Sequence, residues 1–166
     1  MKQTIGIRLR RLEEGDREDF VMLEGDPDTA VLTGLKEGAE DLFRFCMDEA
    51  VSYAAMSGEL FIGHMTFFKS SFTSLPGKPE AWEICFSIFP ECRGMGLGRK
   101  ILEEGIRKAT EELEADVLLA GAFGFNSASI RLLESEGFVY LFSRMDKDGS
   151  GADREEKIFL KVLRKG

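Results

Sequence analysis

The 166-residue chain has few of the residues that metal sites, disulfide frameworks and membrane spans require. It contains one histidine and three cysteines, no CxxC pair and no cluster with metal-ligand spacing, so we expect no metal. Three cysteines cannot all pair, which favours free thiols in a reducing compartment. No apolar run is long enough to cross a membrane, and the N-terminus does not resemble a signal peptide. We therefore expect a cytoplasmic protein with no membrane contact.

Positive charge is also scarce. The 22 Lys and Arg residues stand against 30 Asp and Glu residues, which gives a formal net charge of -8. Binding to a phosphate backbone needs a basic field, so we expect no nucleic-acid partner and favour a cationic or neutral small partner. The length predicts a single domain over residues 1–166, which is large enough for an ordinary hydrophobic core.

Hydrophobic periodicity and turn residues predict the order of the elements. Seven strands are expected, over residues 5–12, 49–56, 59–68, 82–89, 116–123, 138–145 and 157–163. Asp16 is the expected N-cap of a first helix, one or two short helices are expected between residues 26 and 47, and longer helices are expected over 99–114 and 126–136. Residues 70–80 form an expected loop, long enough to be a flap over a site. This order predicts an α/β fold, with one mixed sheet covered by helices on both faces.

A glycine-rich segment joins the strand at 82–89 to the helix at 99–114. Gly94, Gly96 and Gly98 stand at alternate positions, so main-chain N–H groups can approach a ligand at the positive end of the helix dipole. That arrangement indicates a phosphate-binding loop. A P-loop would continue as Gly-Lys-Ser/Thr, whereas Arg99-Lys100-Ile101 follows here, and a dinucleotide fingerprint would read GxGxxG instead of GxGxG. Both common nucleotide loops fit poorly.

The run Arg93-Gly-Met-Gly-Leu-Gly98 resembles the loop Arg/Gln-x-x-Gly-x-Gly/Ala with which the GNAT acetyltransferases bind the pyrophosphate of acetyl-CoA. A second motif begins at Asn126, reads NSASIRLLESEGF, and is similar to a signature of the branch that includes the ribosomal-protein N-terminal acetyltransferases. The strong part of the resemblance spans residues 83–138. It implies a GNAT-type fold with a mostly antiparallel sheet. It also implies direct transfer of an acetyl group from acetyl-CoA to a primary amine, on a small molecule or a protein N-terminus, in a ternary complex.

The resemblance also assigns the expected contacts with acetyl-CoA. The main chain of Phe86 and Ile88 would pair with the pantetheine amides. Arg93 and Arg99 would add charge at the pyrophosphate, although Arg99 also fits a solvated helix residue. Asn126 and Ser129 would lie near the cofactor, with Asn126 serving equally well as a helix N-cap. The pyrophosphate would lie on the main-chain amides of the loop, which are those of Cys92, Arg93, Gly94, Met95, Gly96, Leu97 and Gly98.

Glu83 is the first candidate for the general base, because a charge within a hydrophobic strand is costly unless it is paired or used. A solvent-facing charge on an edge strand is the alternative. His64, the only histidine, is a second candidate on its near-neutral pKa, although a lone strand histidine is more often a packing residue. Family members often carry, seven residues after the motif's Asn, a tyrosine that acts as the general acid. This chain has Leu133 at that position. The general acid is therefore open, with solvent or a serine as the alternatives.

A different reading also fits the missing tyrosine, namely a non-catalytic acyl-CoA-binding or regulatory module. Loss of turnover with unchanged CoA affinity on replacing Glu83 would exclude it. A homodimer is a further expectation from the resemblance, since many relatives pair through their C-terminal strands. The strand at 157–163 is the expected exposed edge.

Overall fold

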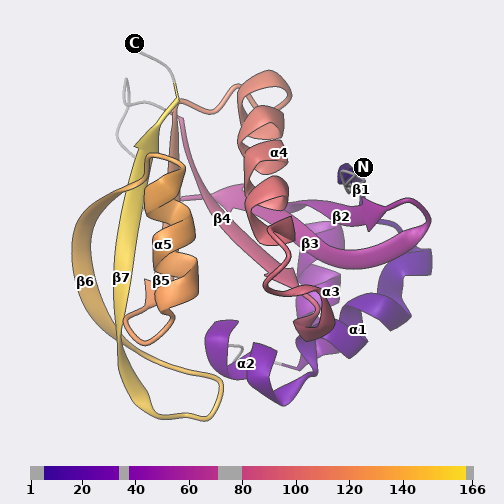
Figure 1. Ribbon diagram of the computed structural model, residues 1–166, viewed down its shortest axis with the longest axis horizontal. Coiled ribbons are helices and arrows are strands. Elements are labelled where there is room, and N and C mark those ends of the chain that lie inside the picture. Colours follow the sequence, from indigo (N-terminus) through magenta and orange to yellow (C-terminus); the bar gives the residue numbers. More distant parts are fainter. Residues whose placement is uncertain (1–5, 34–37, 71–79, 164–166) are drawn as a thin grey trace.

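The computed structural model describes residues 6–33, 38–70 and 80–163. Their strands form one seven-stranded sheet in the order β1-β2-β3-β4-β5-β7-β6 (Figure 1). Only β4 and β5 pair in parallel, so the predicted mixed, mostly antiparallel sheet is confirmed. The strands are β1 (Arg8–Arg11), β2 (Val51–Ser57), β3 (Leu60–Lys69), β4 (Ala81–Ile88), β5 (Val117–Phe123), β6 (Val139–Lys147) and β7 (Asp153–Val162).

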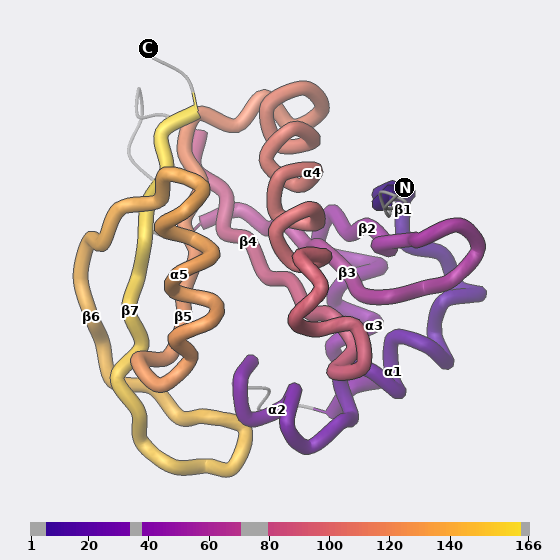
Figure 2. The backbone as a smooth tube through the Cα atoms, viewed as in Figure 1, coloured from indigo at the N-terminus to yellow at the C-terminus, as the bar shows by residue number. Residues whose placement is uncertain are grey.

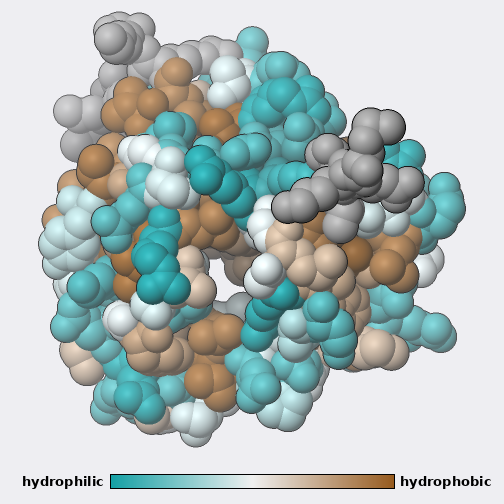
Figure 3. Space-filling model, viewed as in Figure 1, coloured by the Kyte–Doolittle hydropathy of each residue, from teal (hydrophilic) through white to brown (hydrophobic). Residues whose placement is uncertain are grey.

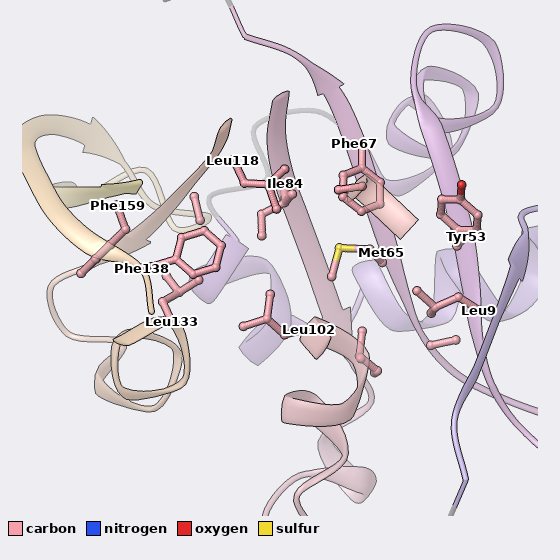
Figure 4. Packing of buried hydrophobic residues seen from close by; sticks show 14 of the residues in the cluster. Leu9, Tyr53, Met65, Phe67, Ile84, Leu102, Leu118, Leu133, Phe138 and Phe159 are labelled. Atoms are coloured by element: carbon pink, nitrogen blue, oxygen red, sulfur yellow. The ribbon is translucent and has the colours of Figure 1, made fainter. Parts of the chain in front are cut away.

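Helices cover both faces of this sheet, as predicted. They are α1 (Arg17–Glu24), α2 (Pro27–Thr33), α3 (Ala39–Asp48), α4 (Leu97–Glu111) and α5 (Ser127–Ser135), with 3-10 turns η1 (Glu14–Asp16) and η2 (Pro90–Cys92). On one face, α4 and α5 pack on the larger core, where Leu102 faces Ile84 and Met65 and Leu133 lies beside Phe138 (Figure 4). The smaller core holds residues of α1 and α3 against β2 and β3. The two cores give the sheet an apolar layer on each side.

Two features at the N-terminus differ from expectation. The strand predicted over residues 5–12 is shorter, since β1 covers Arg8–Arg11, and residue 5 lies outside the described residues. Asp16 stands at the N-cap position of α1, as predicted, but its side chain makes no capping hydrogen bond to the helix. Instead its carboxylate accepts two hydrogen bonds from Arg10, both of 2.8 Å, and one from the main-chain N–H of Glu13. Two charge-assisted hydrogen bonds from one arginine stabilise this buried carboxylate more than a single hydrogen bond from a helix amide would. The tertiary contact therefore overrides the local capping preference.

The C-terminal hairpin also differs from expectation. β6 ends at Lys147 and β7 begins at Asp153. The turn between them is therefore shorter than the predicted loop at 146–153. β7 lies between β5 and β6, which makes β6 the sheet edge and corrects the expected edge at 157–163. The turn comes close to α2, where a Cβ on Gly149 would overlap the backbone of Ala30 (Figure 2).

Asp148 holds this turn together. Its Oδ1 accepts hydrogen bonds from the amide and hydroxyl of Ser150 and from the amide of Ala152, and its Oδ2 accepts one from Arg154. The Ser150 hydroxyl contributes most to lowering the pKa of Asp148, which falls to about 2. The predicted flap at residues 70–80 lies outside the described residues, except for its two ends.

Candidate active site between β4 and β5

The site lies where the two parallel strands separate. β4 and β5 are paired from Ala81 opposite Val117 to Ile84 opposite Ala120, and the pairing stops there. Beyond that point β4 continues to Ile88 on β3, while β5 continues on β7. Strand twist thus opens a gap, visible as the divergence of β4 from β5 in Figure 1. The facing edge of residues 85–88 is available to an extended amide chain.

A cavity of about 1110 Å³ occupies this gap. Its walls come from both separated strands, the glycine-rich loop, the first turns of α4 and α5, and the helices α1, α2 and α3. Figure 3 shows an opening near the centre of the molecule, in the region that Figure 1 shows between α5, the start of α4 and α2. A cavity of this size, with polar groups from several elements, is the usual setting of a ligand site.

The glycine-rich loop has the backbone that the sequence predicts. Gly94 and Gly96 have positive φ angles of 78° and 76°, which residues with a Cβ rarely adopt. A Cβ at either position would meet nothing within 4 Å, so the loop faces open space. Gly96 is also the N-cap of the 15-residue helix α4. The loop therefore presents main-chain N–H groups and a positive helix end to the cavity.

The seven predicted loop residues differ in their surroundings. The amides of Cys92 and Arg93 donate to the carbonyls of Phe89 and Pro90 within the 3-10 turn. These two amides are therefore not free to bind a ligand, and those after Arg93 are the candidates. Leu97 is buried in the core, and the side chain of Met95 is exposed. Cys92 is half-buried and packs against the core.

The two loop arginines already have partners. Arg93 donates to the hydroxyl of Thr29 on α2 at 3.1 Å, which ties the loop to the opposite wall of the cavity. Arg99 forms ion pairs with Glu136 at 2.9 Å and with Glu103 at 3.3 Å. Both arginines line the cavity. Both side chains thus lie beside the glycine-rich loop, and Arg99 is held there by carboxylates.

The second motif lies on the opposite wall. Asn126 is the N-cap of α5, accepting from the amide of Ser129 at 3.2 Å, and both residues line the cavity. Leu133, at the position where relatives often carry tyrosine, is buried and also lines the cavity. Tyr140 does not take that place, because it is exposed on β6 and bonds to Ser143. The described walls therefore offer no tyrosine as a general acid.

Glu83 lies in the cavity wall on β4, with Phe86 and Ile88 further along the same strand. Burial raises the pKa of Glu83, and the neighbouring Glu156 raises it further, while Arg144 lowers it. Arg144 is held by Glu156 at 2.7 Å. A half-buried carboxyl group with a raised pKa is chemically suited to accept a proton near neutral pH.

His64 lies behind the wall. It is completely buried, and its Nε2 lies 2.6 Å from Oε1 of Glu24. Its Nδ1 lies 3.0 Å from the hydroxyl of Thr66, which in turn bonds to Ser52. Glu24 lines the cavity and His64 does not, so the group that faces the cavity at this point is the carboxylate.

The cysteines are poorly suited to act as nucleophiles. Burial raises the pKa of the Cys85 thiol, and Glu24 and Cys46 raise it further, so the thiol stays protonated at neutral pH. The described residues contain no group of His, Cys, Asp and Glu that could hold a metal ion. Among the described helices, none is long and apolar enough to span a membrane.

Comparison with known proteins agrees with this geometry. The model of the acetyltransferase (GNAT) domain family matches residues 7–139 of the chain. The chain belongs to the GNAT acetyltransferase family. This confirms the predicted fold and enzyme class, an N-acetyltransferase that depends on acetyl-CoA.

Similar proteins include YwnH of Bacillus subtilis (strain 168), provisionally named phosphinothricin acetyltransferase, which is 37% identical over 72 residues. That match spans 42% of this chain and 44% of the length of YwnH, so it covers less than half of either protein. The structure of yncA from Salmonella typhimurium, provisionally an acetyltransferase and solved with acetyl-CoA, has a TM-score of 0.76 and 20% identity over 96% of this chain and 95% of that one. Ribosomal-protein-alanine N-acetyltransferase of Brucella melitensis has a TM-score of 0.75 and 22% identity over 94% and 99%.

Sequence reasoning missed Glu24 as a site residue. It lies 40 positions from its partner His64 and belongs to no motif. The sequence offers one signal for its burial, which is that Glu24 directly follows the buried Leu23 on α1. That signal is weak, because a charged residue at such a position is usually exposed to solvent.

Proposed function

We propose that this GNAT acetyltransferase transfers the acetyl group of acetyl-CoA directly to a primary amine in a ternary complex. The observation that carries the proposal is the glycine-rich loop at the start of α4, which opens into the cavity between β4 and β5. The pyrophosphate fits the amides from Gly94 to Gly98, with Arg93 and Arg99 adding positive charge. The unpaired edge of β4 at Phe86 and Ile88 suits the pantetheine amides.

Acetyl-CoA supplies a thioester whose acyl carbon is open to attack by a neutral amine. The work of the chain is then to orient the amine, remove its proton and exclude water. We assign the proton-accepting role to Glu83, because it faces the cavity beside the point where β4 and β5 separate. Its raised pKa favours taking a proton from an amine, directly or through one water.

The proton returned to the CoA thiolate has no tyrosine donor among the described wall residues. We assign this step to Ser129 or to solvent, since Ser129 and Asn126 are the nearby polar side chains of the second motif. Leu133 then contributes only an apolar surface, which keeps the pantetheine end dry.

The wall charges favour an acceptor with positive charge. Seven carboxylates line the cavity against four arginines. Three of the carboxylates, Asp41, Asp48 and Glu49, are exposed on or just after α3, where an acceptor can enter. A cationic small amine or a protein N-terminus both suit this field.

An acceptor screen tests the proposal. The purified chain is incubated with acetyl-CoA and primary amines, and free thiol is measured. We expect at least one amine to release thiol. Replacing Glu83 with glutamine should lower kcat about a hundredfold or more and leave the affinity for acetyl-CoA unchanged. The exposed Glu18, replaced in the same way, is the matched control. Binding of acetyl-CoA without turnover of any amine would favour the non-catalytic acyl-CoA-binding module.

We also propose that the protein works in the cytoplasm, as a homodimer. Its three cysteines are free thiols, which suits a reducing compartment. The edge strand β6 exposes the large apolar side chains of Val139, Tyr140, Leu141 and Met145, which a second copy would cover.

A further inference from the structure

Two buried oxygen atoms at the cavity lack hydrogen-bond partners among the described residues. They are Oε2 of Glu24 and Oγ of Ser87, and both residues line the cavity. A buried carboxylate oxygen without a donor is costly, so native interiors rarely keep one. An unpaired oxygen facing a cavity is explained when a ligand supplies the missing donor.

The carboxylate of Glu24 is firmly held. Its Oε1 lies 2.6 Å from Nε2 of His64, and the side chains of both residues are almost completely buried. His64 is fixed in turn by Thr66 on one side and by the ring of Phe20, whose centroid lies 4.7 Å away. This support uses one carboxylate oxygen and leaves the other, Oε2, buried and without a partner in a residue that lines the cavity.

The neighbouring residues do not supply the missing donor. Burial and then the nearby Glu24 raise the pKa of the Cys85 thiol, which therefore keeps its proton, but this thiol makes no hydrogen bond to Oε2 of Glu24. Three of the four arginines of the cavity wall are paired with other carboxylates, and the fourth, Arg93, donates to the hydroxyl of Thr29. The three pairs are Arg44 with Glu14, Arg99 with Glu136 and Arg144 with Glu156. The side chain of Glu24 therefore keeps one oxygen without a donor in the cavity wall.

Ser87 adds a second acceptor at the same end of the cavity. It lies opposite His64 in the β3–β4 register, so the two side chains share one face of the sheet. Glu83, the assigned base, points to that face from the same strand, four residues away. A group with several N–H donors matches this arrangement of oxygens.

We propose that Glu24 is the acceptor-binding carboxylate, and that its Oε2 receives an N–H of a positively charged ammonium group on the acceptor. His64 is a positioning residue that holds Glu24 in place, and Ser87 is a neighbouring hydrogen-bond partner. This inference rests on the proposed acetyl transfer and adds that the acceptor is bound as a cation.

The test compares Glu24→Gln with wild type, using butylamine, alaninamide and spermidine as acceptors and aniline as an acceptor that is uncharged at the assay pH. Glutamine keeps the shape but removes the charge. We expect KM for the charged amines to rise about tenfold to a hundredfold, with kcat changed little, because a hydrogen bond to a charged group is lost. KM for aniline should change little. His64→Asn should raise the same KM values by a smaller factor.

Glu18→Gln is the matched control, since Glu18 is on the same helix but exposed and outside the cavity. It should leave all constants unchanged. An unchanged KM for the charged amines in Glu24→Gln, or an equal rise for aniline, would overturn the inference. Calorimetric binding of the same amines to the CoA-bound protein gives a readout that needs no turnover. Failure of the wild type to acetylate any amine would contradict the proposed function alone, whereas amine binding lost in Glu24→Gln would still support the inference.

Thermal unfolding shows whether each variant is folded at the assay temperature. Glu24→Gln breaks the buried Glu24–His64 pair, so its Tm should fall below that of wild type, and His64→Asn should lower the Tm as well. The constants are therefore measured well below the Tm of each variant. A rise in KM as large for aniline as for the charged amines would then contradict the assignment, because loss of structure would account for both.

Discussion

Replacing Gly96 with alanine should weaken acetyl-CoA binding far more than it weakens the fold. Gly96 has a φ of 76°, and a Cβ there meets nothing within 4 Å. The only cost to the folded protein is thus the left-handed backbone, about 1–2 kcal/mol, part of which is offset by a less flexible unfolded chain. For a domain of this size the Tm should fall by roughly 2–4 °C per kcal/mol.

The empty space around that Cβ is where the pyrophosphate of acetyl-CoA is proposed to lie. A methyl group there would hold the phosphate away from the loop amides, so the Kd for acetyl-CoA should rise about tenfold or more, which corresponds to about 1.4 kcal/mol. Calorimetric titration measures the Kd, and thermal unfolding measures the Tm of the same samples.

Gly58 supplies a matched control. It has a similar φ of 60°, and a Cβ there also meets nothing within 4 Å, but it lies in the β2–β3 hairpin outside the cavity. Gly58→Ala should lower the Tm by a similar amount and leave the Kd unchanged. An unchanged Kd in Gly96→Ala, or an equal loss of affinity in both variants, would refute the reasoning.

Three further predictions concern the fold and assembly. Gly63→Ala should lower the Tm severely or prevent folding, because its Cβ would overlap the carbonyl oxygen of Ser87 across the β3–β4 pair; a Tm near that of wild type would contradict this. Asp148→Ala should lower the Tm at pH 7, and the difference should shrink as the pH falls from about 4 through about 2, since a depressed carboxyl pKa stabilises the fold only above that range; a difference independent of pH would refute it. Light scattering should show a dimer that Met145→Glu on β6 converts to a monomer, and a monomeric wild type would exclude the proposed interface.

The sequence predicted best those parts of the site whose residues are contiguous. The glycine-rich loop was predictable because three glycines between a strand and a helix favour a left-handed backbone there and leave the main-chain amides uncovered by side chains. The second motif was predictable as the start of a helix, since Asn126 caps α5 through local hydrogen bonds.

Features that depend on distant contacts were not predictable. The carboxylate of Asp16, at the N-cap of α1, pairs with Arg10 instead of with a helix amide. The position of β7 inside the sheet follows from pairing partners that periodicity does not specify. Glu24 becomes a site residue only because α1 packs over β3 and brings it to His64. The roles of Glu83 and His64 stay predictions, although the structure places Glu83 in the cavity wall and His64 behind it.

Calorimetric titration of the purified chain with acetyl-CoA, with ATP and NAD as controls, tests the central claim most directly. The account predicts micromolar binding of acetyl-CoA and no comparable binding of ATP or NAD. Absence of acetyl-CoA binding in protein shown to be folded, or tighter binding of ATP, would contradict the assignment of the loop between β4 and α4 as the pyrophosphate site.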